Sequence, residues 1–267
     1  MARIIAVVNQ KGGVGKTTTS VNLSASLAAL DRRVLLVDLD PQGNATMGSG
    51  IEKSRLQHSV YSVLLGQSEI EAAMQSSPTG KFDLLPANRE LAGAEIELVD
   101  VQQREGRLKA ALLGLEPQYD FIIIDCPPAL NLLTVNALAV AQSVLIPMQC
   151  EYYALEGLSD LVQTLKKVRA HINPKLEIEG LLRTMFDPRN SLAQQVSAQL
   201  EQHFGDKVYR TVIPRNIRLA EAPSYGKPVM YYDAGSKGAQ AYHALAAELL
   251  ARTENQEKDN TEHGQTT

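Results

Sequence analysis

The stretch that decides the fold is Asn9-Gln10-Lys11-Gly12-Gly13-Val14-Gly15-Lys16-Thr17-Thr18. It follows an apolar run at 4–8 and precedes a helical pattern at 17–30, so a strand, a loop and a helix are predicted in that order. Glycines let backbone N–H groups turn inward around phosphate oxygens, and the following helix adds its positive end. The alternative is a glycine-rich turn without a ligand, which the Gly-Lys-Thr spacing disfavours.

The loop predicts a site for a nucleoside triphosphate. Lys16 would reach the β- and γ-phosphates, the Thr17 hydroxyl would hold Mg²⁺, and Thr18 would reach the α-phosphate. The first position of the usual G-x-x-x-x-G-K-T pattern is Gln10, and an additional lysine, Lys11, stands in the loop. Lys11 is either a solvated loop lysine or a residue that crosses a dimer interface to the partner's nucleotide.

Three aspartates lie at the ends of predicted strands. The strand at 33–38 ends in Asp38 and is followed by Asp40, and the strand at 121–125 ends in Asp125. Ligands of open α/β sheets bind at these carboxyl ends. We assign Asp40 to positioning the water that attacks the γ-phosphate, and Asp38 to supporting Mg²⁺ waters or the loop. A strand-end aspartate that caps a turn is the alternative for each. The predicted ATP site thus spans residues 10–18 and 33–44, with Lys11, Lys16, Asp40 and Asp125 as catalytic candidates and Thr17, Asp38 and Asp125 as metal candidates.

The rest of the chain alternates short apolar runs with helical patterns. Strands are predicted at 3–9, 33–38, 121–125, 143–147, 177–184 and 208–213, and helices at 17–30, 155–171, 191–204 and 238–251. Continuously apolar strands are typical of parallel sheets covered on both faces. The pattern predicts a single-domain α/β P-loop NTPase with a doubly wound, mostly parallel sheet flanked by helices.

Two segments are less regular. Residues 48–116 carry short amphipathic pieces that we expect to form helices beside the sheet. The ATPase domain is therefore expected at 1–252. Residues 253–267 have almost no apolar side chains and are predicted to be a disordered polar tail.

The composition excludes several classes of protein. A net charge of −4 disfavours a globally basic nucleic-acid binder, although a local basic face stays open. Cys126 and Cys150 are too few for a disulfide framework or a Cys-rich zinc site. No run approaches the roughly 18 apolar residues of a membrane span, and 4–8 is too short for a signal peptide. We expect a cytoplasmic, reduced protein without a membrane partner.

Three motifs resemble those of the deviant Walker-A ATPases, the ParA/MinD family. Residues 11–17 resemble the signature loop, 38–44 the second motif, and Ile124-Asp125-Cys126-Pro127-Pro128 the third, with Asp125 as the Walker-B aspartate. The resemblance implies an ATPase of weak intrinsic activity that uses ATP and Mg²⁺. It implies that Lys11 contacts the other subunit's nucleotide in an ATP-sandwich homodimer. It also implies adenine contacts from Met185, Pro214 and Asn216.

Longer stretches at 147–157, 184–189 and 214–224 resemble chromosomal ParA proteins of the Soj type, and the resemblance extends over roughly residues 2–250. It implies ATP-bound dimers that bind double-stranded DNA on the nucleoid without sequence preference. A ParB-type, centromere-binding partner (Spo0J-type) would stimulate hydrolysis and release them, and such cycles segregate DNA. Arg189 and Arg218 match the DNA-contacting arginines of the family, with solvated surface charge as the alternative.

Rival functions are weighed against particular residues. A MinD-type cell-division ATPase would need an amphipathic C-terminal helix, and 254–260 offers no apolar face. An iron–sulfur ATPase would need cysteines that bridge two subunits, and no C-x-x-C pair occurs. In a DNA-coating protein ATP would be only a switch, whereas Asp40 favours turnover. A plasmid ParA with an added helix-turn-helix is disfavoured because the loop begins about ten residues from Met1. A small plasmid-encoded partition ATPase stays open.

Overall fold

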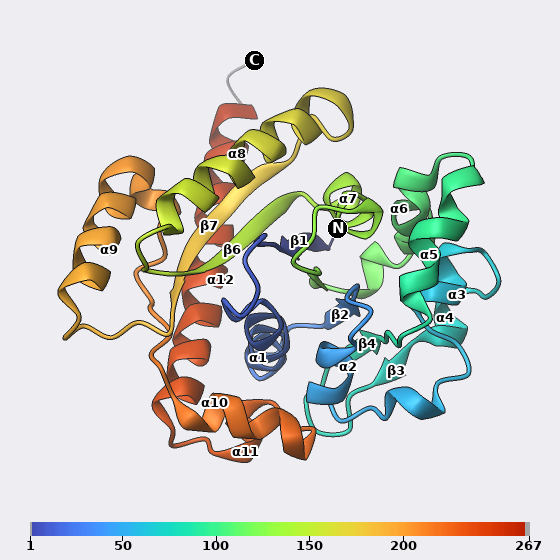
Figure 1. Cartoon of the computed structure of the whole chain (residues 1–267), viewed down its shortest axis with the longest axis horizontal. Coiled ribbons are helices and arrows are strands. Elements are labelled where there is room, and N and C mark those ends of the chain that lie inside the picture. The colour runs from blue at the N-terminus through green and yellow to red at the C-terminus, as the bar shows by residue number, and fades with distance from the viewer. Residues whose placement is uncertain (1, 265–267) are drawn as a thin grey trace.

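The computed structural model describes residues 2–264 of the chain, with side chains through residue 255. Within them, a seven-stranded sheet has the order β3-β4-β2-β5-β1-β6-β7 (Figure 1). Every neighbouring pair is parallel except β3 with β4. The strands are β1 (Arg3–Val7), β2 (Val34–Asp38), β3 (Gln75–Ser76), β4 (Asp83–Leu85), β5 (Phe121–Asp125), β6 (Ser143–Gln149) and β7 (Glu177–Thr184). The predicted α/β fold with a mostly parallel sheet is confirmed.

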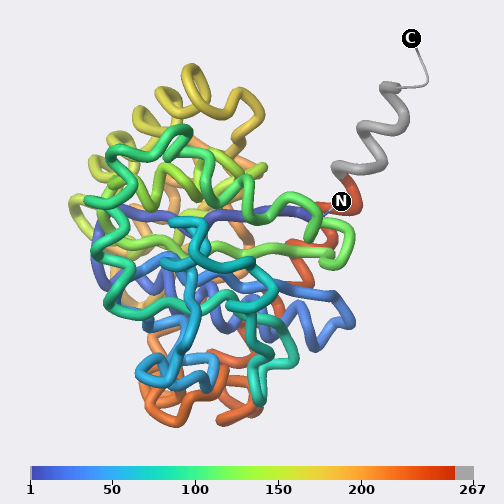
Figure 2. Tube along the Cα trace, turned by 90° about the vertical axis from the view of Figure 1, so that its right-hand side faces the viewer, coloured from blue at the N-terminus to red at the C-terminus, as the bar shows by residue number. Residues whose placement is uncertain are grey.

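Helices cover both faces of the sheet. One face carries α3 (Val60–Leu64), α4 (Ile70–Ala73), α5 (Leu91–Glu97), α6 (Arg107–Leu112), α7 (Leu132–Val140), α8 (Ala154–His171) and α9 (Ser191–Phe204). The other face carries α1 (Lys16–Ala28), α2 (Asn44–Gly48), α10 (Ile217–Glu221), α11 (Val229–Tyr232) and α12 (Lys237–Gly264). Figure 2 shows the blue first strand between these two layers. Within residues 2–264, no helix is both long and apolar enough to cross a bilayer.

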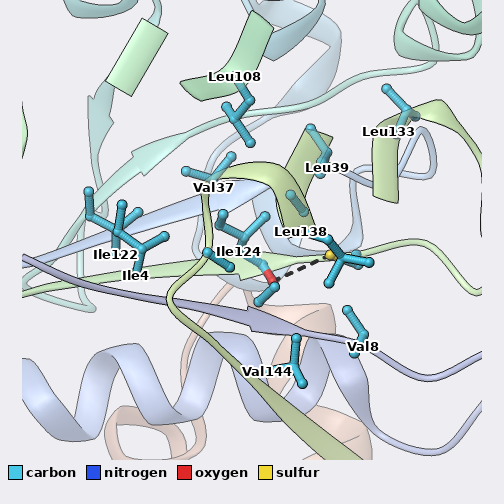
Figure 3. Packing of buried hydrophobic residues seen from close by; sticks show 14 of the residues in the cluster. Ile4, Val8, Val37, Leu39, Leu108, Ile122, Ile124, Leu133, Leu138 and Val144 are labelled. Carbon is cyan, nitrogen blue, oxygen red and sulfur yellow. Dashed lines mark hydrogen bonds between the residues drawn. The ribbon is translucent and has the colours of Figure 1, made fainter. Parts of the chain in front are cut away.

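Each face of the sheet buries its own hydrophobic cluster. On the first face, strand residues such as Ile4, Ile124 and Val144 pack with Leu108 of α6 and Leu138 of α7 (Figure 3). On the second face, alternate strand residues such as Ile5 and Ile123 pack against α1 and α12. Full burial of one such side chain stabilises the fold by about 1.5–3 kcal/mol. Burial on both faces explains why the strands are continuously apolar.

The strand predicted at 208–213 is wrong. In that segment only Val208 forms a bridge, to Leu181 of β7. The backbone N–H groups of Arg210 and Thr211 each donate to the Glu248 carboxylate of α12, at 2.8 Å. Tyr209 and Ile213 still donate to carbonyl oxygens of β7, but Glu248 accepts the Thr211 amide between them, so the pairing with β7 is interrupted and no eighth strand forms.

Two other segments depart from the expected pattern. Residues 48–116 form the predicted short helices, but they also contain β3 and β4, which are too short to show a period of two. The last helix, predicted to end at Ala251, continues to Gly264. It therefore runs into the tail for which disorder was predicted, and residues 265–267 lie outside the described part of the chain.

Replacing Gly180 with alanine should lower the free energy of unfolding by about 1–3 kcal/mol. A Cβ there would lie 2.5 Å from Tyr209 Cε2 and 2.8 Å from the Lys207 carbonyl oxygen, and Tyr209 is fully buried. Chemical denaturation would measure the change. Gly157→Ala in α8 is the control, because no described atom lies within 4 Å of its added Cβ. It should gain up to about 1 kcal/mol from helix propensity. Equal stability of the two variants would contradict the packing argument.

Candidate functional site

Strand order brings the glycine-rich loop and two aspartates to one edge of the sheet. The loop leaves β1, which lies between β5 and β6. Val7, the last residue of β1, is in register with Asp125, and Asp125 is in register with Asp38 of β2. The chain passes from β1 to β2 on one side of β1, and later from β5 to β6 on its other side, so the direction of the strand order changes at β1. Ligands of open α/β sheets bind at such a switch point.

The loop has the backbone conformation that a phosphate site requires. Gly13 and Gly15 have φ angles of +74° and +91°, in the left-handed region where a side chain would be strained. Gly15 caps α1, whose first turn at 16–19 contains no acidic side chain. The positive end of the helix is therefore not neutralised by its own residues and remains available to an anion.

Lys16 is a buried cation at the base of the loop. The residue is 7% exposed, and its Nζ donates to the Lys11 carbonyl oxygen at 3.1 Å. Burial lowers the pKa of the Lys16 ammonium, while the charge of Asp125 partly opposes this shift. A polyanionic ligand would favour the charged form of this lysine, as the predicted phosphate contact requires.

Asp38 fixes the turn that follows β2. Its Oδ2 accepts hydrogen bonds from the Thr46 amide at 2.8 Å and the Thr46 hydroxyl at 2.7 Å, and its Oδ1 accepts from the Asp40 amide at 3.2 Å. Burial raises the pKa of Asp38 above its ordinary value. These contacts lie in the turn after β2 and not in the glycine-rich loop, so they fit the turn-capping alternative, and the metal role of Asp38 stays a prediction.

Asp125 is fully buried, and only one of its two carboxylate oxygens accepts a hydrogen bond from the described residues. Its Oδ1 accepts from the Ser20 hydroxyl at 2.9 Å, whereas Oδ2 has no hydrogen-bond partner among the described residues. Burial and then the neighbouring charge of Asp38 raise the pKa of Asp125, and the nearby hydroxyl groups of Thr17 and Ser20 oppose the shift. A divalent cation would offset this crowded negative charge.

The oxygen atoms at this edge fit Mg²⁺. Thr17 and Asp125 offer hard oxygen ligands, and one carboxylate oxygen is unpartnered within the described chain. Within the same residues, no group of three or more His, Cys, Asp or Glu side chains could hold a metal by itself. Mg²⁺ usually takes one or two protein ligands and completes its shell with phosphates and water, so a triphosphate would complete this site.

Asp40 lies half-buried on the turn after β2. Its Oδ1 accepts from the Gln42 amide at 2.9 Å, and its carbonyl oxygen accepts from the Gly43 amide at 2.8 Å. Its charge acts on the pKa values of both Lys16 and Asp125. The structure therefore places Asp40 within electrostatic reach of the residues that would surround the γ-phosphate.

A hollow of about 330 Å³ beside the loop brings together the three predicted adenine contacts. Its lining includes Gly15, Thr18, Thr184, Met185, Pro214 and Asn216. The volume lies within the range of small-molecule pockets. Asn216 uses its Oδ1 to accept the Arg218 amide at 3.0 Å and cap α10, so the Asn216 amide nitrogen is the group left to face a base. Met185 has a φ of +49°, in the left-handed region.

The remaining predicted residues lie on the surface in ion pairs. Lys11, 55% exposed, pairs with Glu151. Arg189, 88% exposed, pairs with Asp187 at 2.8 Å. Arg218, 46% exposed, pairs with Glu221 at 2.8 Å and with Asp233 at 3.2 Å. All three cations are accessible to another molecule, which would have to compete with these carboxylates.

A larger hollow of about 660 Å³ lies between β7 and α12, apart from the loop. The Arg183–Glu201 and Arg252–Glu248 ion pairs line it, so much of its charge is already compensated within the chain. None of the predicted site residues lines it. Volume alone therefore does not identify the functional site here.

Sequence reasoning missed several residues that complete the site. Ser20 and Thr46 bind the buried aspartates, Glu151 pairs with Lys11, and Gln149 and Thr184 bind the loop. Gln149, Glu151 and Thr184 stand in the stretches that resembled chromosomal ParA proteins, which was the available signal. Ser20 faces Asp125 one turn after Lys16, a spacing that α-helix geometry could have indicated.

Known proteins resemble this chain over most of its length. Residues 2–178 match the family described as an AAA domain. The sporulation initiation inhibitor protein Soj of Bacillus subtilis is 56% identical, over 94% of this chain and 99% of its own. The chromosome partitioning protein ParA of Myxococcus xanthus is 52% identical, over 94% and 89%.

Solved structures are similar as well. Cobyrinic acid a,c-diamide synthase from Mycobacterium smegmatis, with bound ATP analogue and magnesium, superposes with a TM-score of 0.83 at 40% identity, covering 95% of this chain and 96% of that one. The cell division ATPase MinD of Pyrococcus furiosus superposes with a TM-score of 0.76 at 28% identity, covering 94% and 99%.

Proposed function

Because the chain belongs to the Soj/ParA family of P-loop chromosome-partitioning ATPases, which uses ATP and Mg²⁺, we propose that it is a dimeric switch that segregates DNA. Two ATP-bound copies hold double-stranded DNA on the nucleoid without sequence preference. A ParB-type partner stimulates a slow intrinsic hydrolysis and thereby releases the dimer. The segregated DNA is either a chromosome or a plasmid.

The observation that carries this proposal is the difference in burial between the two loop lysines. Lys16 is buried and faces the site from within its own chain, while Lys11 lies exposed at the rim. One lysine suffices to counter the β/γ charge within a subunit. The exposed Lys11 is therefore available to the nucleotide of a second copy, and ATP would join the two subunits.

Several residues of the chain have separate roles in the proposed hydrolysis. Thr17 and Asp125 are the residues that would hold Mg²⁺, which when bound would supply positive charge to offset the negative charge of the phosphates. Asp38 supports this edge through the turn it binds. Lys16 offsets negative charge on the phosphates, and Asp40 orients the attacking water.

The proposed DNA contacts have to be local. The chain carries a net charge of −4, so long-range attraction to DNA is weak and the arginines must act at short range. Dimerisation doubles each contact. Phosphate oxygens would replace the Asp187 carboxylate at Arg189, and at Arg218 they would compete with the carboxylates of Glu221 and Asp233. Binding through such contacts releases counterions and is steeply salt-dependent.

Replacing Arg189 or Arg218 with glutamate should weaken DNA binding by roughly tenfold or more and leave ATP binding unchanged. The slope of log affinity against log salt should fall by about 2 for the dimer, one contact per subunit. Fluorescence anisotropy with labelled DNA would measure both. Lys109→Glu in α6 makes the same charge change elsewhere and should retain most of the affinity. Parental affinity in the arginine variants would remove them from the DNA interface.

A single experiment tests the proposed function as a whole. DNA binding is measured with ATP, ADP and no nucleotide across a salt series, together with sedimentation of the protein. We expect dimers and tight DNA binding with ATP alone, both weakened with ADP, and DNA affinity lost as salt rises. Equal DNA binding in all three nucleotide states would refute the switch.

A positioning ATPase that cycles on membranes, as in MinD-type proteins, is the alternative within the same family. The similarity to the MinD structure supports it, but the relatives at 49% identity or more include several named for chromosome partitioning. ATP-dependent binding to anionic lipid vesicles, without binding to DNA, would favour the alternative.

A further inference from the structure

The carbonyl groups of a phosphate-binding loop need hydrogen-bond donors from elsewhere in the protein. When the N–H groups turn inward to a ligand, carbonyl oxygens turn outward into the protein, and each one shielded from water needs a donor. Three carbonyls of this loop have side-chain donors. Lys16 Nζ donates to the Lys11 oxygen at 3.1 Å, Gln149 Nε2 to the Gly13 oxygen at 3.2 Å, and Thr184 Oγ1 to the Val14 oxygen at 2.7 Å.

Thr184 makes the shortest and most buried of these contacts. It is the last residue of β7. Both partners are buried, with Thr184 2% exposed and Val14 1% exposed. Its methyl group also lies beside Gly15, where a Cβ would be 3.8 Å from Thr184 Cγ2. Thr184 thus binds the Val14 carbonyl oxygen, and its methyl group lies near the next residue, Gly15.

Gln149 approaches the loop from the neighbouring strand. It is the last residue of β6, and its Nε2 also contacts Met185 Sδ at 2.8 Å. Met185 follows Thr184 directly and lines the hollow beside the loop. The ends of β6 and β7 therefore form one connected support for the loop, and that support continues into the wall of the proposed base pocket.

We propose that Thr184 and Gln149 are positioning residues for nucleotide binding, which hold the loop with its N–H groups inward before the ligand arrives. Neither needs to touch the phosphates. Their donors satisfy outward carbonyls, so the loop does not have to be reorganised when the nucleotide binds. This role belongs to the single subunit and does not depend on dimerisation, on DNA or on a stimulating partner.

The test compares Thr184→Val with Thr184→Ser. Valine keeps the shape but leaves the shielded Val14 oxygen without its donor, whereas serine keeps the hydroxyl. We expect the valine variant to bind ADP about tenfold more weakly, and the serine variant to stay within about threefold of the parent. Calorimetric titration of the protein with ADP in a buffer that contains Mg²⁺, without DNA or partner, gives the dissociation constants.

AMP separates positioning of the phosphate loop from an effect on the base pocket. AMP lacks the β-phosphate that the loop would enclose, so its competition with a fluorescent nucleotide should change by less than about threefold in Thr184→Val. Parental ADP affinity in Thr184→Val, or equal losses for ADP and AMP, would overturn the proposal for Thr184.

Gln149→Leu provides a second variant in case Thr184→Val does not fold, as judged by circular dichroism. Its hydrogen bond to the loop is longer and more accessible to water, so we expect about threefold weaker ADP binding with AMP unaffected. Unchanged ADP affinity in Gln149→Leu would remove Gln149 from the proposal. If Thr184→Val does not fold, the test depends on Gln149→Leu alone, and unchanged ADP affinity in Gln149→Leu would then overturn the whole proposal.

Discussion

Replacing Asp40 with alanine should lower the rate of ATP hydrolysis at least about a hundredfold while ATP affinity changes by less than about threefold. The carboxylate lies half-buried past β2, and its contact within the turn is the Gln42 amide, so its removal should not unfold the site. Without it, the attacking water loses the group that orients it. ATP-bound dimers should then accumulate on DNA, because hydrolysis is the proposed release step.

The measurement combines phosphate release under saturating ATP with sedimentation of the protein on DNA. Asp40→Asn serves as the sharper variant, because its amide oxygen can still accept the Gln42 amide while the charge is lost. Asp160→Ala on α8 is the control for loss of an exposed aspartate. Near-parental turnover in Asp40→Ala would refute the water-positioning role and move attention to other groups at this edge.

Replacing Gly12 with valine should weaken ATP-dependent dimerisation by at least about thirtyfold and leave ATP binding intact. No described atom of the chain lies within 4 Å of a Cβ built at Gly12, so the single subunit has room for the new side chain. The clash would arise only with the loop of a second copy. In a two-fold symmetric dimer the cost of overpacking, about 1–3 kcal/mol, counts twice.

Light scattering with a non-hydrolysable ATP analogue would give the dimer fraction at several protein concentrations. Gly106→Val before α6 is the matched control, because a Cβ there also meets no described atom within 4 Å and its φ of −104° lies outside the left-handed region. The control should dimerise as the parent does. Normal dimers of Gly12→Val would show that the loops do not face each other across the interface.

Local patterns were enough to predict the loop, its strand and its helix. Gly13 and Gly15 need left-handed φ angles, and the change from a short apolar strand to a helical pattern is visible within about 30 residues. The aspartates were also predictable, because the carboxyl ends of parallel strands meet at one edge. These inferences held because each depends on neighbouring residues or on a general rule of sheet geometry.

The error at 208–213 has the opposite cause. The segment has the apolar character of a strand, but Glu248 of α12 takes the amide donors of Arg210 and Thr211. A side chain nearly 40 residues away thus decides the backbone pairing, and no local pattern contains that information. The same limit applies to β3 and β4, which exist through pairing rather than through propensity.

The sequence by itself determined that this chain is an α/β P-loop protein, and it led us to propose the ATP site at its glycine-rich loop, since glycine conformation and hydrophobic periodicity are local properties. Only the tertiary structure decided which side chains complete that loop. Gln149 and Thr184 lie 136 and 170 residues from the carbonyls that they bind. They reach those carbonyls because β6 and β7 end beside the loop in the order of the sheet, and strand order is a property of the whole fold.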